Sequence, residues 1–353
     1  MSVAIHGTNG VTFNDGTVQP SAAVGKNLII NGDMRINQRG NYSTTVNSTS
    51  VTPAVDRWLG RGKGSAGVFN ILATAENSNG FNNHVVLDVT TASTPSGTDS
   101  YRFQQMIEGY NIARLNWGTA SAKSITLSFW VKSTLTGTFG GSVANGDYNR
   151  FNPFSYTISA ANTWEYKTVT IAGDTSGTWN TTNGLGMRLN FSLGAGSDRL
   201  GTAGTWTSSV LEGVTGQTNH IATNSSNLRI TGVQVEEGTS ATDFEHLQFG
   251  QQLALCQRYY QVHDQSVNAY YNAGIVGFPF NTVMRASPTL SLSYSGTANR
   301  VYRLDTGATA DLTISGSTMT TTGFNHLYAF TPSGWASAAG VGFRSTFVFS
   351  AEL

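Results

Sequence analysis

The chain has 353 residues, of which only 11% are charged, well below the roughly 25% that is typical of soluble domains. The formal net charge is zero, so nothing predicts binding to nucleic acid or to another highly charged polymer. A single cysteine, Cys256, excludes a fold stapled by disulfides. Glycine, serine, threonine and asparagine suit turns and exposed β-faces, so their abundance predicts an all-β protein.

Residues 1–26 form a separate N-terminal segment. Two turn signals, Asn9-Gly10 and Asp15-Gly16, flank a short expected strand at Val11–Phe13. A segment this short cannot bury a core alone. We therefore expect it to attach to another copy of the chain or to a different protein. No basic start followed by an apolar run is seen, so we expect no signal peptide, and no stretch predicts membrane insertion.

Residues 27–245 predict one β-sandwich, because many short strands are separated by turn clusters. A short helix is expected at Glu108–Asn116. The expected strands are Gly67–Ala73, His84–Thr90, Tyr101–Ile107, Ile125–Lys132, Gly137–Val143, Pro153–Ile158, Trp164–Ile171, Leu185–Leu193 and Leu228–Glu236.

Two of these strands alternate strictly between apolar and polar residues, which predicts one buried and one solvent-facing side for each. They are Ile125–Lys132 and Leu185–Leu193. If they are neighbours in one sheet, their polar sides form a common face with an aromatic plate and with amine, amide and guanidinium donors. The candidate glycan-binding residues on this face are Trp130, Lys132, Arg188 and Asn190.

Three interpretations of this face remain open. It could stack a sugar on Trp130, it could be packed against a sister subunit, or it could be ordinary exposed surface. In Leu228–Glu236 the apolar alternation changes phase at Gly232, which predicts a β-bulge.

Residues 246–263 follow a helical rhythm, which predicts a linker helix at about Phe249–Tyr259. Residues 264–353 then predict a smaller C-terminal β-domain, with Pro279 and Pro288 at strand ends or edges. Its expected strands are Ile275–Phe280, Thr289–Tyr294, Arg300–Leu304, Thr309–Ser315, Thr318–Thr322, His326–Phe330 and a closing strand Val341–Ala351. The fold class is therefore all-β: a jelly-roll β-sandwich, a short helical linker and a smaller C-terminal β-domain.

Several stretches between about residues 10 and 260 resemble bacteriophage tail-fibre and related virion proteins. The resemblance lies in Asn27–Arg39 (NLIINGDMRINQR), Asp56–Trp58 (DRW), Ile125–Lys132 with Asn162–Ile171, Thr231–Gly238 (TGVQVEEG) and Phe244–Tyr260 (FEHLQFGQQLALCQRYY). In addition, Gly10–Gln19 is similar to short repeats near the attachment ends of such fibres.

This resemblance implies a virion appendage with a carbohydrate-binding-module-like jelly roll, assembled in the host cytoplasm. It also implies a homo-oligomer, commonly a trimer, that attaches to another virion protein through residues 1–26 and to a host-surface glycan. The C-terminal domain matches less well, as expected of a part that faces a variable host surface.

The sequence offers no pattern for catalysis. No phosphate loop, zinc spacing, nucleophile elbow or dinucleotide fingerprint occurs, so we expect no enzyme activity, cofactor or metal. The glycine-rich stretch Gly60–Gly64 predicts a flexible loop. A glycan depolymerase needs two carboxylates about 5–10 Å apart, whereas Glu236 and Glu237 are adjacent and should point to opposite faces.

Three functions therefore follow in order of preference. The first is a non-enzymatic fibre or spike subunit that contributes to glycan attachment. The second is a purely structural head- or tail-bound appendage whose jelly roll serves assembly. The third is a glycan depolymerase.

Overall fold

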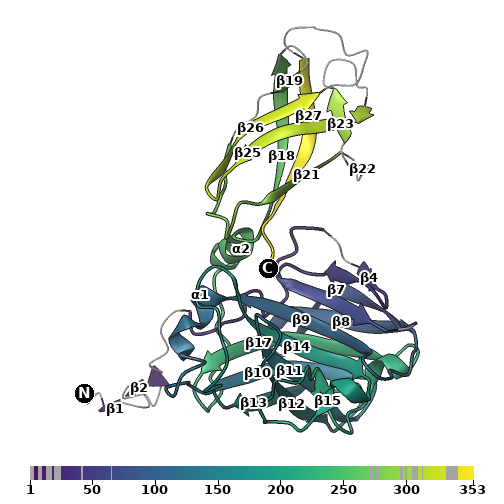
Figure 1. The fold of residues 1–353 in the computed structure, drawn as a ribbon, viewed down its shortest axis with the longest axis vertical. Coiled ribbons are helices and arrows are strands. Elements are labelled where there is room, and N and C mark those ends of the chain that lie inside the picture. Colours follow the sequence, from purple (N-terminus) through teal and green to yellow (C-terminus); the bar gives the residue numbers. More distant parts are fainter. Residues whose placement is uncertain are drawn as a thin grey trace.

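The structure is a computed structural model. It describes residues 4–6, 10–12, 18–19, 25–40, 43–64, 66–270, 273–274, 278–294, 297–298, 300–303, 309–311, 313–330 and 341–353. Figure 1 shows a β-sandwich and, above it, a smaller group of strands, with a short helix and the C-terminus between the two. The expected all-β class, jelly-roll sandwich and small C-terminal β-domain are confirmed.

Two six-stranded sheets form the sandwich (Figure 1). The first, which we call sheet B, has the order β13 (Glu165–Ile171), β10 (Ile125–Ser133), β17 (Asn227–Glu237), β8 (Phe81–Thr91), β7 (Val68–Ser78) and β4 (Ser43–Val46). The second, sheet C, has the order β12 (Phe151–Ile158), β11 (Gly137–Asn145), β14 (Leu185–Ala195), β9 (Ser100–Glu108), β6 (Trp58–Lys63) and β5 (Val51–Pro53). The chain crosses between the sheets repeatedly, as from β9 to β10 and back to β11.

The core lies between the two sheets and is built from the apolar sides of the alternating strands. Ile125, Leu127, Phe129 and Val131 of β10 are fully buried, as are the matching residues of β14. All nine strands expected in residues 27–245 are present, with bounds within a few residues of those expected. Alternation predicted them well because each strand buries one complete face.

Strand β6 was not expected. Gly60 and Gly62 lie within it rather than in a flexible loop, so that expectation was wrong. A Cβ atom on Gly60 would come within 2.4 Å of Val46, and one on Gly62 within 2.0 Å of the Asn47 carbonyl oxygen. The glycines let β6 lie close to its neighbours. Trp58, at its start, is 1% exposed and stacks on Phe103 at 4.8 Å.

Both expected helices are present but shorter. Helix α1 spans Gly109–Ile112 and continues as a 3-10 helix, Ala113–Leu115. Helix α2 spans Phe249–Gln257, and the side chain of Gln251 accepts a hydrogen bond from the Gln248 N–H at its start. Strand β18 begins at Tyr260, so residues 260–263 of the expected linker belong to a strand.

The C-terminal domain contains two sheets. One has the order β19 (Ala273–Gly274), β18 (Tyr260–Tyr270), β27 (Val341–Ser350), β21 (Thr289–Tyr294), β22 (Thr297–Ala298), with β23 (Arg300–Arg303) pairing β27 and β24 (Thr309–Asp311). The other has the order β20 (Phe278–Pro279), β26 (Gly323–Phe330), β25 (Thr313–Met319). The last strand is central rather than closing, because it pairs with three others.

Some C-terminal expectations differ from the structure or lie partly outside it. The expected strands Thr309–Ser315 and Thr318–Thr322 are redistributed over β24 and β25. Residues 275–277 of the expected Ile275–Phe280 strand and Leu304 lie outside the described residues.

The N-terminal segment contributes a three-stranded sheet, β1 (Ala4–His6), β2 (Gly10–Thr12) and β3 (Val18–Gln19). The expected strand Val11–Phe13 corresponds to β2, apart from Phe13. Asn9, Phe13 and the turn signal at Asp15-Gly16 lie outside the described residues.

The sandwich, α2 and the C-terminal domain meet at a polar junction. Glu108, at the end of β9, accepts two hydrogen bonds from Arg258, at 2.8 and 2.6 Å, and one from the hydroxyl of Tyr259 at 2.7 Å. Glu352 accepts hydrogen bonds from Arg39 and Arg57 of the sandwich. These contacts fix the C-terminal domain to one end of the sandwich.

Candidate functional site

The four predicted site residues do not form one face. Trp130 and Lys132 lie on β10 in sheet B, whereas Arg188 and Asn190 lie on β14 in sheet C. Since the apolar sides of both strands face the shared core, their polar sides point outward on opposite surfaces of the sandwich. The expectation of neighbouring strands was wrong, because the chain crosses between sheets.

Trp130 forms an aromatic pair on the outer surface of sheet B. It lies directly opposite Tyr166 of β13, with ring centroids 5.4 Å apart and ring planes at 47°. Trp130 is half-buried and Tyr166 is 45% exposed. The pair therefore presents a partly exposed aromatic surface held by a cross-strand contact.

A groove of about 580 Å³ adjoins this pair, within the range of roughly 300–1,000 Å³ that small-molecule sites occupy. Both aromatic and polar side chains line it. The lining residues are Asn79, Phe81, Ser128, Trp130, Tyr166, Gly232, Ala241, Thr242, Asp243, Phe244 and His246.

One wall of the groove is the segment 239–246, which crosses the outer side of β17. It is tied to the sheet by Gln234, whose amide donates to the carbonyl oxygens of Thr242 and Asp243 at 3.3 Å. Glu236 accepts hydrogen bonds from the backbone N–H and the hydroxyl of Thr242. The wall therefore has a fixed position relative to Trp130.

The expected β-bulge at Gly232 is confirmed and helps to shape this groove. The register between β10 and β17 shifts between Ser128 and Trp130, and Gly232 has a φ of +61°. A Cβ atom there would come within 2.5 Å of the Phe81 ring. The bulge thus lets Phe81 reach the groove, where it contacts Phe244 at 5.0 Å.

Lys132 lies beside the aromatic pair but is not among the groove-lining residues. It is opposite Arg229 of β17, which forms an ion pair with Glu76 at 3.1 Å. His84 is buried nearby, with its ring edge against Trp164 at 5.4 Å. Burial, followed by the positive charge of Arg229, lowers the pKa of His84, which keeps this part of the face from gaining a further charge at neutral pH.

The polar side of β14, which carries Arg188 and Asn190, is less exposed than the alternation of residues 185–193 predicted. Asn190 and Ser192 are almost fully buried, and Arg188 is half-buried. Residues of the segment 199–218 cover this surface; Gln217, for example, donates to the hydroxyl of Ser192 at 2.9 Å. The polar side of β14 is therefore not a simple solvent-facing surface.

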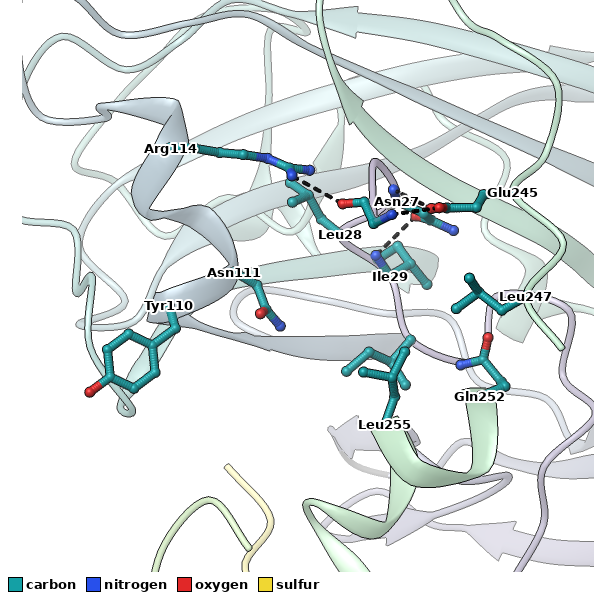
Figure 2. Close-up of a pocket in the computed structure, with 12 residues that line it drawn as sticks. Asn27, Leu28, Ile29, Tyr110, Asn111, Arg114, Glu245, Leu247, Gln252 and Leu255 are labelled. Carbon is teal, nitrogen blue, oxygen red and sulfur yellow. Dashed lines mark hydrogen bonds between the residues drawn. The ribbon is translucent and has the colours of Figure 1, made fainter. Parts of the chain in front are cut away.

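A second cavity, of about 260 Å³, lies where residues 25–30 meet α1 and α2 (Figure 2). Its charged groups are already engaged. Arg114 donates to the carbonyl oxygens of Gly25 and Lys26, and Glu245 accepts from the backbone N–H groups of Gly25 and Asn27. The hydrogen bonds of Arg114 and Glu245 therefore hold residues 25–27 in place at this cavity.

The part of the chain that the structure describes has neither a metal-binding cluster nor a helix that could span a membrane. There, no three or more His, Cys, Asp or Glu side chains gather in a way that could hold a metal ion. Among the same residues, no helix has the length and apolar character needed to cross a membrane. Cys256 is buried, and burial raises its pKa well above the usual range, as expected of a packing residue.

In comparisons with known proteins, no family model matches the chain and no curated protein matches it. Solved structures do. The enzymatically active domain of tailspike protein 4 from bacteriophage CBA120 matches at 16% identity and a TM-score of 0.31, over 60% of this chain and 21% of that chain. A family 61 carbohydrate-binding module in complex with β-1,4-galactotriose matches at 10% identity and a TM-score of 0.30, over 60% of this chain and 99% of that one.

A tandem of family 22 carbohydrate-binding modules from Paenibacillus barcinonensis matches at 8% identity and a TM-score of 0.30, over 95% of this chain and all of that one. At TM-scores close to 0.3, these similarities assign no function to this chain.

Proposed function

We propose that this protein is a non-enzymatic subunit of a bacteriophage virion appendage and that its sandwich binds host-surface glycans in the Trp130–Tyr166 groove. The observation that carries the binding role is the aromatic pair at the edge of a groove of about 580 Å³ with polar side chains around it. Trp and Tyr rings offer an apolar plate to the C–H face of a sugar, while hydroxyl, amide and carboxylate groups bind its hydroxyls.

The acidic groups of the groove support a binding role without catalysis. Asp243 is the one acidic side chain among the groove-lining residues. Glu236 lies under the same wall, but it is 4% exposed and is engaged by Thr242. Glycoside hydrolysis needs a second carboxylate with access to the scissile bond.

The place on a virion is proposed from the resemblance of Asn27–Arg39 and Phe244–Tyr260 to tail-fibre proteins. Residues 1–26 then attach the subunit to another virion protein in the host cytoplasm, and three copies form the appendage. A homotrimer has a mass of about 113 kDa, three times 37.6 kDa. Three weak sites on one particle gain avidity without strong single contacts.

The binding role is tested by glycan-array binding of the full chain and of Trp130→Ala. Loss of the larger ring removes the plate, so array signal should fall at least ten-fold. Tyr110→Ala is the matched control, because Tyr110 is 59% exposed on α1 and lies outside the groove. This control should bind like the wild type.

A purely structural appendage is the alternative, and one observation favours it. Some of the stretches that carry the resemblance, such as Asn27–Arg39, build the internal junction and not the groove. If the full chain binds no glycan or host cell while light scattering still finds trimers, the structural role is correct. Release of reducing ends from a host polysaccharide would contradict both roles and indicate an enzyme.

A further inference from the structure

The outer face of sheet C carries an unusual set of polar residues in three adjoining rows. Pairing between β6, β9 and β14 fixes these rows. One row holds Arg61 and Arg102, the next holds Gln104 and Asn190, and the third holds Met106 and Arg188.

The positive charge in these rows exceeds the negative charge. Arg61 and Arg102 lie directly opposite each other, an arrangement that is unfavourable for like charges. Arg102 forms an ion pair with Glu212, and both side chains are 4% exposed. Among the residues that the structure describes, Glu212 is the one acidic group paired with an arginine of this set.

The other two arginines have no acidic partner. Arg188 donates only to the sulfur of Met106 at 3.7 Å and to the Gly146 carbonyl oxygen at 3.4 Å. No side-chain hydrogen bond or ion pair joins Arg61 to any other described residue; burial and the charge of Arg102 lower its pKa, and only the charge of Glu212 acts in the opposite direction. Burial, together with the charges of Arg102 and Arg61, lowers the pKa of Arg188 to about 10. Charge that is partly buried and unpaired is costly unless a ligand completes it.

The aromatic ring of Tyr148 covers the middle of the set. Its ring centroid lies 5.0 Å from the guanidinium of Arg188 and 5.8 Å from that of Arg102. The hydroxyl of Tyr148 also bonds Glu212. Tyr148 belongs to the turn between β11 and β12 and has a φ of +60°, so its position over the arginines is set by the backbone.

Two buried amide groups between the arginines are incompletely bonded. Gln104 and Asn190 are each 0% exposed and lie opposite each other in the middle row. The Nε2 of Gln104 and the Oδ1 of Asn190 have no hydrogen-bond partner. Both amides lie beneath the surface, where Gln104 accepts a hydrogen bond from Arg102 at 2.9 Å and Asn190 donates to Ser142 at 3.1 Å, so they form the floor of the arginine set.

We propose that this face, with Arg61 and Arg188 beside the ring of Tyr148, is a second ligand site, which binds a carboxylate-bearing sugar such as a uronic acid. The carboxylate binds the two unpaired guanidinium groups, which favour planar carboxylate oxygens. The site lies on the opposite surface of the sandwich from Trp130 and does not depend on glycan binding there.

The experiment is calorimetric titration of the full chain with D-galacturonate and with D-galactose, which differ only in the carboxylate. Binding of galacturonate alone is expected, and it should weaken at 1 M salt. Arg61→Gln and Arg188→Gln should each reduce affinity at least ten-fold. Lys63→Gln is the matched control, because it removes a positive charge from the same strand outside the set.

The melting temperature of the free protein gives a second test, which separates a ligand-binding arginine from one that only stabilises the fold. Because Arg61→Gln removes an unpaired, partly buried charge, the melting temperature of the free protein should rise by about 2 °C while galacturonate binding is lost. A fall in melting temperature would contradict the proposal.

Other outcomes would also overturn it. Phosphate or sulfate that binds as tightly as galacturonate would point to a general anion site. No galacturonate binding by the wild-type chain would show that the two arginines do not form a ligand site. Loss of oligomerisation in Arg188→Gln would identify the face as a contact between copies. The glycan-array test of Trp130 uses neutral glycans, so its result remains separate from all of these.

Discussion

His220 shows how a single buried side chain links stability to pH. It lies at the start of a 3-10 helix, His220–Ala222, and is 0% exposed, with its Nε2 3.3 Å from the hydroxyl of Ser226. Burial lowers its pKa to about 4, whereas an unfolded histidine has a pKa of about 6.5. The folded protein therefore keeps this ring neutral over a pH range in which the unfolded chain is protonated.

We predict that this ring contributes to acid sensitivity. Between pH 6.5 and about 4, only the unfolded state binds the proton, so stability falls as the pH falls. The loss is at most about 1.4 kcal/mol per pH unit and about 3 kcal/mol in total. Above pH 6.5 the contribution is fully present. Urea unfolding of wild type and His220→Asn at pH 7.5 and pH 4.5 measures it, and the variant should show the weaker pH dependence.

His246→Asn is the control for this comparison, because His246 is exposed. Its stability curve should run parallel to that of the wild type. If His220→Asn also runs parallel, the neutral buried ring is not the cause of the acid sensitivity.

At the scale of elements, the bulge in β17 connects the sequence to the groove. The phase change at Gly232 was visible in the sequence, because apolar residues move from even to odd positions there. The bulge lies beside Trp130 and brings Phe81 into the groove wall. The backbone of one glycine thereby sets the shape of the surface that we propose for glycans.

We predict that Gly232→Ala destabilises the protein and weakens glycan binding. The left-handed φ costs an alanine about 1 kcal/mol, and the clash with Phe81 adds about 1–3 kcal/mol. Gly204→Ala is the matched control, since Gly204 has a φ of +80° but nothing within 4 Å of an added Cβ. Urea unfolding should separate the two variants by the cost of the clash. Equal destabilisation would mean that Phe81 moves aside freely.

Strands were predictable from the sequence, but their assignment to sheets was not. The alternation in β10 and β14 follows from a local rule, namely that one side of each strand is buried. Which strands pair depends on connections that cross the sandwich, and no local pattern records these. For this reason Trp130 and Arg188 were placed on one face although they lie on two.

The strand that carries Arg61 and the burial of two polar residues of β14 were also not predicted, because they lie in glycine-rich or polar stretches. Arg61 belongs to the arginine set, yet its neighbours Gly60 and Gly62 indicated a loop. The signal that could have found it is the alternation Trp58-Leu-Gly-Arg-Gly-Lys63, with small residues on the side that packs against β4 and β7. Asn190 and Ser192 were expected to be exposed, because no local pattern in β14 indicates that the segment 199–218, which follows it, folds back over this side of the strand.

At the scale of the whole molecule, three of the stretches that resemble tail-fibre proteins meet at the junction, namely Asn27–Arg39, Asp56–Trp58 and Phe244–Tyr260. Asn31 binds the backbone of Ile36 and Asp56, and the indole N–H of Trp58 donates to the Asn31 carbonyl oxygen at 2.9 Å. Arg57 packs over the ring of Tyr259 at 3.5 Å. Resemblance alone did not reveal this shared role. In the structure these stretches tie the sandwich to α2 and to the end of the chain.

This junction should make the two β-domains unfold together. Arg285 donates to the carbonyl oxygens of Asn183 in the sandwich and of Ala351 in the C-terminal tail. Glu352 accepts from Arg57 and Arg39, whose side chains are only 2% and 9% exposed. Separation of the domains would leave Arg57 without its acidic partner, while Arg39 would keep Asp56, so the wild type should show one calorimetric transition.

We predict that Glu352→Ala uncouples the domains. Loss of the carboxylate leaves Arg57 buried with only the Met106 carbonyl oxygen and the Tyr259 ring as partners, which costs about 3 kcal/mol. The C-terminal domain should then melt first, about 5 °C below the sandwich. Glu237→Ala is the control, because Glu237 forms an exposed ion pair with Lys123 worth less than about 1 kcal/mol. Two transitions in the wild type, or one unchanged transition in Glu352→Ala, would show that the junction does not couple the domains.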